Sequence, residues 1–224
     1  MKNVIVLNLL LSLLLVSCNQ NEDDLLQGRC DYVDFKYFSG EQVFLGEMSS
    51  DYLLVGLDSA FSNDDIRLFI SGFDKFDQSY DLNISLSPSL RYKNVLLKFE
   101  NSKSCKQITR IISDLEQYNM VSYAHYTMQT DDCNNWFFEP MGSLCVDSYI
   151  SRFNVKLHNE DDLELVSDLM LQTNTELVEV DGLVCRLRAT KSSVGDALTM
   201  ANFFFESGLF DWAEPEMVKI AAEE

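Results

Sequence analysis

The two histidines are the side chains of this sequence best suited to acid–base chemistry near neutral pH. His158 ends an alternating segment that starts at Arg152, and it falls on the polar side of that predicted strand. His125 lies between Ala124 and Tyr126, and a strand histidine beside aromatic residues is ordinary in a structural role. The sequence has no Gly-x-Ser-x-Gly elbow, Gly-rich phosphate loop or His-Glu-x-x-His pair. We therefore expect no enzymatic activity, no metal site and no cofactor.

The cysteines could bind metal, carry lipid or bond to one another. Those that follow Cys18 match no zinc pattern built from C-x-x-C pairs. An exported chain can oxidise its cysteines, but the number left after Cys18 is odd. We expect isolated buried thiols, with a Cys133–Cys145 bridge as the alternative. The cysteines concerned are Cys30, Cys105, Cys133, Cys145 and Cys185.

The N-terminus predicts export and lipidation. Lys2 precedes an apolar run from Val4 to Val16, which is too short to span a bilayer comfortably. The run ends in Leu15-Val16-Ser17-Cys18, which resembles the lipobox of bacterial lipoproteins, in which the cysteine is lipid-modified. We expect residues 1–17 to be a lipoprotein signal peptide and residues 18–31 a tether held by lipid on Cys18. A plain signal peptide followed by an unrelated cysteine is the alternative.

The overall charge limits the classes of partner that we expect, and an acidic run near the N-terminus indicates the location. The net charge of −19 and the pI near 4.3 argue against nucleic-acid binding, which needs clustered Lys and Arg. Contact with the membrane is expected only through the N-terminal lipid. The acidic run at residues 21–24 looks like the export tag of surface lipoproteins in Bacteroidetes. We therefore expect an outer-membrane lipoprotein exposed at the cell surface.

Residues 32–129 show patterns in the order strand, helix, strand, strand, helix, strand, after a leading hairpin. The hairpin is predicted over residues 32–45, because two alternating runs flank Ser39-Gly40. Apolar residues at helical spacing, including Ile66 and Ile70, predict a helix opened by Asn63. A second helix starts near Ser104. The predicted strands are 52–57, 80–86, 95–99 and 121–128.

Residues 151–224 repeat this order. Asn159 is a predicted N-cap, and the three acidic residues after it suit the first helical turn. Ser193 with Asp196 resembles a capping box for the second helix, which Gly208 ends. Asp181-Gly182 predicts a hairpin turn. The predicted strands are 152–158, 176–180, 184–188 and 210–216.

These patterns predict an α+β protein with two ferredoxin-like (βαββαβ) subdomains, each an antiparallel sheet with helices on one face. The expected divisions are an N-terminal subdomain at 32–129, a linker at 130–150 and a second domain at 151–224. A sheet covered by helices on one face leaves its other face free to bind a partner, although the fold does not identify that partner.

The second domain resembles the pro-region of subtilisin-like serine peptidases of Bacteroidetes lipoproteins. The resemblance covers residues 151–224 most clearly, and the hairpin over residues 35–45 resembles one that follows the lipid anchor in the same group. No Asp-x-Gly, His-Gly-Thr or Gly-Thr-Ser-Met motif of the peptidase triad occurs, so we expect a pro-region without the catalytic domain. The segments that carry the resemblance are 196–202, 206–210 and 210–216.

The resemblance implies binding to a subtilisin-like protease in trans, as an inhibitor or as a folding chaperone. A pro-region binds and stabilises the folded protease through its sheet, and its C-terminal tail lies in the active-site cleft. Glu214 and Glu216 match the family's pair of acids that cap helix N-termini of the protease. The tail residues implied to occupy the cleft, with the last nearest the catalytic serine, are Met217, Val218, Lys219, Ile220, Ala221 and Ala222.

Two other interpretations remain open at this point. The chain could be a surface binding or adhesion module that reuses the fold, with Trp136, Phe137 and Trp212 as candidate contacts. It could also be the remnant of a truncated protease gene, without a function of its own.

Overall fold

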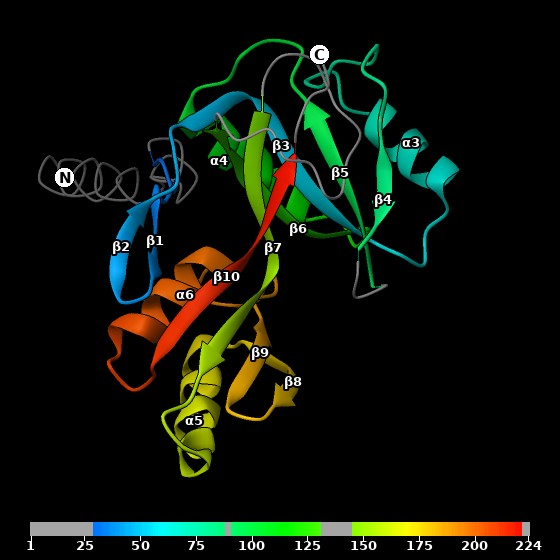
Figure 1. The fold of residues 1–224 in the computed structure, drawn as a ribbon. Coiled ribbons are helices and arrows are strands. Elements are labelled where there is room, and N and C mark those ends of the chain that lie inside the picture. The colour runs from blue at the N-terminus through cyan, green and yellow to red at the C-terminus, as the bar shows by residue number, and fades with distance from the viewer. Residues whose placement is uncertain (1–28, 88–90, 131–144, 221–224) are drawn as a thin grey trace, which may run out of the picture.

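The computed structural model describes residues 29–87, 91–130 and 145–220. In these residues the chain is α+β, with one eight-stranded antiparallel sheet, four α-helices, a short 3-10 helix and a separate two-stranded hairpin (Figure 1). The prediction of an α+β protein with antiparallel sheets is confirmed. The N-terminal elements are β1 (Phe35–Phe38), β2 (Glu41–Phe44), β3 (Met48–Asp58), α3 (Asn63–Ser71), β4 (Ile84–Leu86), β5 (Tyr92–Lys98), α4 (Cys105–Glu116) and β6 (Val121–Thr130).

The C-terminal elements follow in a matching order. They are β7 (Cys145–Lys156), the 3-10 helix η1 (Glu160–Asp162), α5 (Leu163–Thr173), β8 (Glu176–Asp181), β9 (Val184–Arg188), α6 (Ala197–Glu206) and β10 (Trp212–Ile220). We call residues 48–130 the N-terminal half and residues 145–220 the C-terminal half.

The N-terminal half has the strand order β4-β5-β3-β6. Alternate residues of β3, including Leu53 and Val55, point to one face, where they pack against Ile66 of α3 and Ile108 of α4. Gly56 lies against the ring of Tyr123 on the neighbouring strand, and a Cβ at this position would meet that ring at 2.1 Å. The glycine therefore permits the close approach of β3 and β6.

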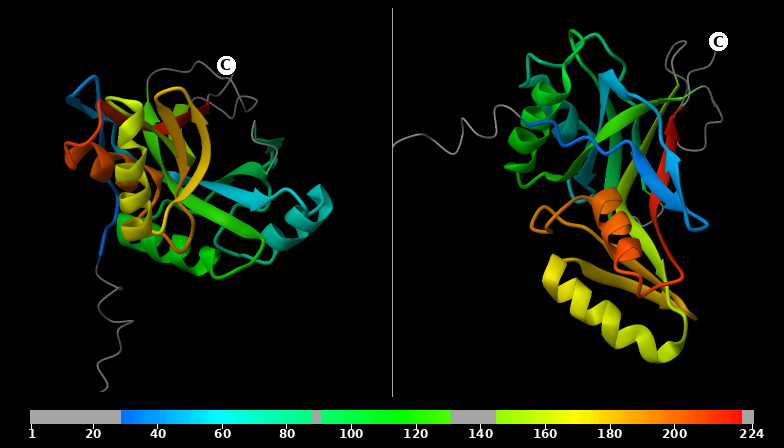
Figure 2. Two further views of the ribbon diagram at one scale, coloured as in Figure 1. Left: turned by 90° about the horizontal axis from the view of Figure 1, so that it is seen from below. Right: turned by 90° about the vertical axis from the view of Figure 1, so that its left-hand side faces the viewer.

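The C-terminal half has the strand order β10-β7-β9-β8. Phe153 and Val155 of β7 point to the face covered by helices, and both are fully buried with Leu187 of β9 and Phe204 of α6. In both halves the fourth strand lies beside the first and the second strand lies at the outer edge. Helices α4, α5 and α6 lie on one side of the strands (Figure 2).

The two halves share one sheet, whereas the sequence predicted two separate sheets. The pairing of β6 with β7 joins them through Met128 and Asp147, Gln129 and Val146, and Thr130 and Cys145. The prediction missed this because β6 continues two residues beyond the predicted end, and β7 begins inside the range assigned to the linker. The residues at the end of β6 pair with those at the start of β7.

The N-terminal hairpin connects the two halves on the helix side. The predicted turn is confirmed, because Ser39 and Gly40 both have positive φ between β1 and β2. Tyr37 of β1 stacks on Phe205 of α6, with ring centroids 4.3 Å apart. The Nδ2 group of Asn202 donates to the backbone oxygen of Phe35 at 3.1 Å. The hairpin therefore packs on the C-terminal half, although the chain that leads into it is tied to the N-terminal half.

That tie is a disulfide between Cys30 and Cys105, whose Cα atoms are 5.3 Å apart. The sequence predicted isolated thiols for both residues, and this prediction was wrong. The two cysteines are 75 residues apart in sequence, so their spacing carried no local signal. Cys185 is a buried free thiol, as predicted. The alternative Cys133–Cys145 bridge lies outside the described side chains.

Most helix ends agree with the ends predicted from the sequence. Asn159 caps η1, its side chain accepting from the amide of Asp161, and Gly208 has the left-handed φ expected after α6. The predicted Ser193 capping box is wrong, because the N-cap of α6 is Asp196 and its side chain accepts from the amide of Thr199. The predicted strand at 80–86 forms only over β4. In the described residues, no helix is long and apolar enough to cross a membrane.

Candidate functional site

The candidate binding surface is the face of the C-terminal half opposite its helices. In β7, Phe153 and Val155 point to the helices, so Arg152 and Asn154 point the other way. Arg152 pairs with Arg188 in the β7–β9 register, and Asn154 pairs with Arg186. We call this surface the charged face; its residues are Arg152, Asn154, Glu176, Glu179, Arg186, Arg188 and Glu216.

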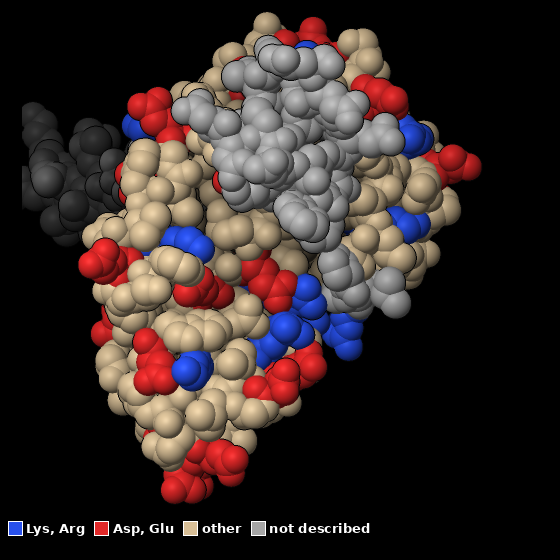
Figure 3. Space-filling view, in the orientation of Figure 1, with Lys and Arg blue, Asp and Glu red and all other residues tan. Residues whose placement is uncertain are grey.

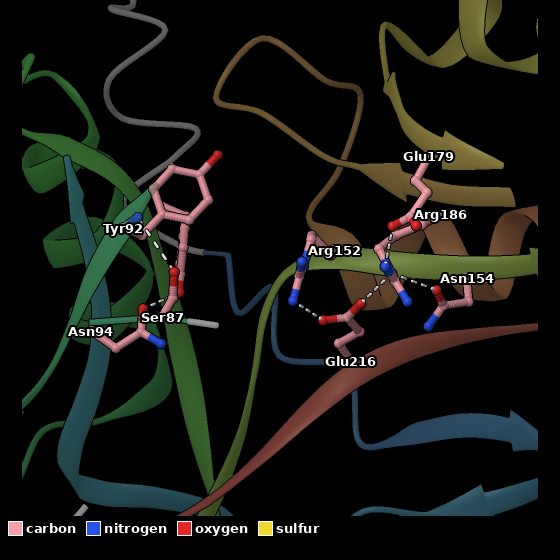
Figure 4. A network of polar contacts seen from close by, with 9 residues as sticks. Ser87, Tyr92, Asn94, Arg152, Asn154, Glu179, Arg186 and Glu216 are labelled. Atoms are coloured by element: carbon pink, nitrogen blue, oxygen red, sulfur yellow. Dashed lines mark hydrogen bonds and ion pairs between the residues drawn. The ribbon is translucent and has the colours of Figure 1, made fainter. Parts of the chain in front are cut away.

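Glu216 is the centre of the charged face (Figure 4). One of its carboxylate oxygens lies 2.6 Å from Nη2 of Arg152, and the other lies 3.0 Å from Nε of Arg186. Glu216 lies at a register shift between Pro215 and Met217, and such irregularities redirect side chains. Because both oxygens are engaged, the carboxylate is held in one orientation by two guanidinium groups.

The network continues outward from Arg186. Its Nη1 atom contacts the carboxylate of Glu179, and its Nε atom lies 3.3 Å from Oδ1 of Asn154. The side chains of Arg152 and Glu216 are 11% and 19% exposed, whereas that of Glu179 is 53% exposed. Water therefore screens the outer pair more than the inner one, and removing one partner of the inner pair should cost more stability.

A second part of the surface spans the two halves. Arg188 is 7% exposed and lies 3.3 Å from the carboxylate of Glu176. Its guanidinium group also lies 5.6 Å from the ring centroid of Tyr92, which belongs to β5 of the N-terminal half. Beside it, the Tyr123 hydroxyl donates to Oδ1 of Asn94 at 2.6 Å. Acidic and basic side chains lie interleaved on the face turned toward the viewer (Figure 3).

Glu214 has a weaker partner than Glu216. Its carboxylate lies 3.6 Å from Nζ of Lys36 on β1, a distance beyond that of a direct hydrogen bond. The two acids that the sequence singled out are thus both engaged within the chain, one loosely with the hairpin and one tightly with two arginines.

The predicted cleft-binding tail is largely part of the sheet. Met217 pairs with Tyr149 of β7, and Val218 pairs with Ser148 and is buried. Lys219 and Ile220 continue the same ladder to the end of β10. Ala221 and Ala222 lie outside the described residues, as does the predicted lipidation site Cys18.

Each histidine contacts another part of the chain. His125 is buried, its Nδ1 atom lies 2.7 Å from the backbone oxygen of Tyr149, and burial lowers its pKa. His158 is exposed, as predicted, and contacts the carboxylate of Asp211 before β10. This contact holds the pKa of Asp211 below its usual value. The described residues contain no group of three or more His, Cys, Asp or Glu side chains placed to hold a metal ion.

Sequence reasoning missed the arginines of the charged face. The alternation of Arg152 and Asn154 predicted a solvent side of the strand, and the same pattern in β9 places Arg186 and Arg188 on one face. The available signal was that both strands carry arginines on the same alternating positions. Their pairing with Glu216 was not predictable, because it depends on β10 lying beside β7.

The chain has no identifiable relatives in two comparisons with known proteins. No protein-family model matches it, and no curated protein shows significant sequence similarity to it.

Proposed function

We propose that this protein is a non-catalytic surface lipoprotein that binds a subtilisin-like serine protease in trans, as an inhibitor or folding chaperone. The observation that carries the proposal is the charged face. Its side chains are fixed by ion pairs on the face of a βαββαβ half that the protein's own helices leave uncovered. Polar groups that are already held by ion pairs lose little conformational freedom when a partner docks.

The finer description of the fold belongs to the same proposal. Each half has the order strand, helix, strand, strand, helix, strand, with the first and third strands central. This order supports two ferredoxin-like subdomains, of which the second corresponds to the pro-region. The matching order in the two halves is also what a duplicated unit would produce.

The ion pairs within the chain affect how easily Glu214 and Glu216 could bind to a protease. A partner helix that approaches Glu216 competes with Arg152 and Arg186 for the carboxylate. Glu214 is released more easily, because its contact with Lys36 is longer. We therefore expect Glu214 to serve as the helix cap and Glu216 to hold the surface in shape.

The tail would also act differently from a free extended peptide. Residues 217–220 are paired with β7, so they reach a cleft only if part of β10 separates from the sheet. Ala221 and Ala222 follow β10 in the sequence, and the resemblance implies that Ala222 lies nearest the catalytic serine. We expect inhibition to depend mainly on these last residues.

The test is inhibition of a subtilisin-like protease from the same organism, measured with a chromogenic peptide. The protein should start at residue 19, which keeps both partners of the Cys30–Cys105 disulfide. We expect saturable inhibition, weakened at least about tenfold by removing residues 221–224, since this loses a few apolar contacts and leaves β10 intact. Removing only Glu223 and Glu224 is the matched control and should change little.

If the folded protein does not inhibit the protease at any concentration that can be reached, the proposal that it is an inhibitor is wrong. If the protein raises the refolding yield of the protease but does not inhibit it, the proposal of a folding chaperone remains and that of an inhibitor does not. If neither effect appears, a surface binding module or a gene remnant becomes the better interpretation.

A further inference from the structure

The outer strand of the C-terminal half, β8, has an unpaired edge. It stands at one end of the strand order and lies beside β9, away from the N-terminal half (Figure 1). Among the described residues, no backbone hydrogen bond connects residues 176–181 to any strand or loop other than β9. An outer edge of this kind presents backbone N–H and C=O groups to which a further extended chain can bond.

The two sides of β8 differ in chemistry. Residues that pair across antiparallel strands lie on the same side of a sheet. Two acids of β8 therefore lie on the charged face, and two apolar residues lie on the side of the helices. The pairs with β9 are Glu176–Arg188 and Glu179–Arg186 on the charged face, and Leu177–Leu187 and Val180–Cys185 on the helix side.

The helices leave the apolar side chains of β8 partly uncovered. Leu177 and Val180 are each 44% exposed, although their partners in β9 are fully buried. Val178 lies at a register shift and is 37% exposed. A chain that lies along this edge would remove part of this apolar surface from water, which is favourable.

The acidic side chains of β8 are accessible as well. Glu176 and Glu179 contact arginines of β9, but their side chains are 57% and 53% exposed. Asp181 pairs with Val184 in the same ladder, which places a third acid on the charged face. Together with the net charge of −19, these acids favour a basic partner at this edge.

A second copy of the chain fits this edge poorly. Two β8 strands that pair antiparallel with Leu177 opposite Val180 also place Glu176 opposite Asp181. Like charges directly opposite each other destabilise a pair of strands, and the net charge of each copy adds repulsion. The complementary occupant is a segment with lysine or arginine opposite the acids and apolar residues opposite Leu177 and Val180.

We propose that β8 binds an extended segment of a partner protein in which apolar and basic residues alternate, and that this segment adds a strand to the sheet. Backbone hydrogen bonds to the free edge supply affinity, and the alternating side chains supply specificity. The site lies at the edge of the sheet and does not depend on which protein docks on the charged face.

The probe is a short capped peptide in which lysine and valine alternate. At physiological salt, the protein that starts at residue 19 should bind it saturably, at least about tenfold more tightly than a peptide of the same composition with its lysines and valines in separate blocks. Hydrogen exchange should show new protection at residues 176–181 and none at β4, the outer strand of the N-terminal half. Equal affinity for the two peptides, or protection that does not include β8, would overturn the proposal.

Two lysine substitutions separate strand addition from attraction by net charge. Val180→Lys places a charge opposite the valines of the peptide and should weaken binding at least about tenfold. Val194→Lys is the matched control, because Val194 is 74% exposed outside the strands and the change in net charge is the same. It should weaken binding less than about twofold, since salt screens a distant charge.

Similar losses for the two variants would mean that the peptide is attracted by net charge alone, and would contradict the proposal. Circular dichroism establishes whether each variant is folded. The hydrogen-exchange result on the wild type depends on neither variant, so it decides the question even if Val180→Lys does not fold.

Discussion

Replacing Glu216 by alanine is expected to destabilise the protein by about 3 kcal/mol, because the substitution leaves two arginines beside each other without their shared carboxylate. Arg152 and Glu216 are 11% and 19% exposed, so water compensates the lost partner only in part. Urea denaturation at pH 7 measures the loss as a lower midpoint. Raising the salt concentration should reduce it only slightly, because a sheltered pair is poorly screened.

Two further variants make this result specific. Glu214→Ala is the matched control on the same strand and should cost less than about 1 kcal/mol, since its contact with Lys36 is long. Glu216→Gln keeps an acceptor for one guanidinium and should fall between the two. Equal losses for Glu214→Ala and Glu216→Ala would show that the arginines do not depend on Glu216.

This comparison also separates stability from binding. Under the proposed function, Glu214→Ala should weaken protease binding by about 1 kcal/mol or less without lowering stability much. Glu216→Ala should lower stability first and binding as a consequence. A binding loss measured for the double variant alone could not distinguish these causes.

The predictable part of the fold was the part that local patterns determine. Alternation in β7 and helical spacing in α3 depend on neighbouring residues, so the sequence showed them. The Ser39-Gly40 turn was predictable for the same reason, because its backbone needs positive φ.

The unpredicted part depends on contacts between distant segments. The β6–β7 pairing joins strands separated by the region read as a linker, and no residue in either strand signals its partner. The same holds for Glu216, whose partners come from β7 and β9. The sequence identified Glu216 through a resemblance, but could not show that its carboxylate is already engaged.

The disulfide illustrates the same limit. Among the cysteines after Cys18, spacing alone favoured no pair, and the bond forms because the segment before the hairpin passes the start of α4. Its position matters for the hairpin, which packs on α6 and contacts β10 through Lys36 and Glu214. The disulfide fixes the start of this segment on one half while the hairpin rests on the other.

Removing the disulfide is expected to have the largest effect on stability. Cys30→Ala with Cys105→Ala should lower the free energy of unfolding by about 4 kcal/mol, because the bond closes a loop of 75 residues and restricts the unfolded chain. For a chain of this size, that corresponds to a fall in Tm of roughly 10 °C. Urea denaturation with and without dithiothreitol measures the effect: the wild type should shift to the midpoint of the double variant when reduced.

The double variant is its own control, because dithiothreitol should leave its midpoint unchanged. A further shift on reduction would mean that another bond contributes, one that involves Cys133 or Cys145. If the wild type is also insensitive to the reductant, Cys30 and Cys105 are not bonded in the protein. In that case the hairpin would still be held by its contacts with α6 and β10. The chain before it would be held on the N-terminal half by the contact between the rings of Tyr32 and Tyr126.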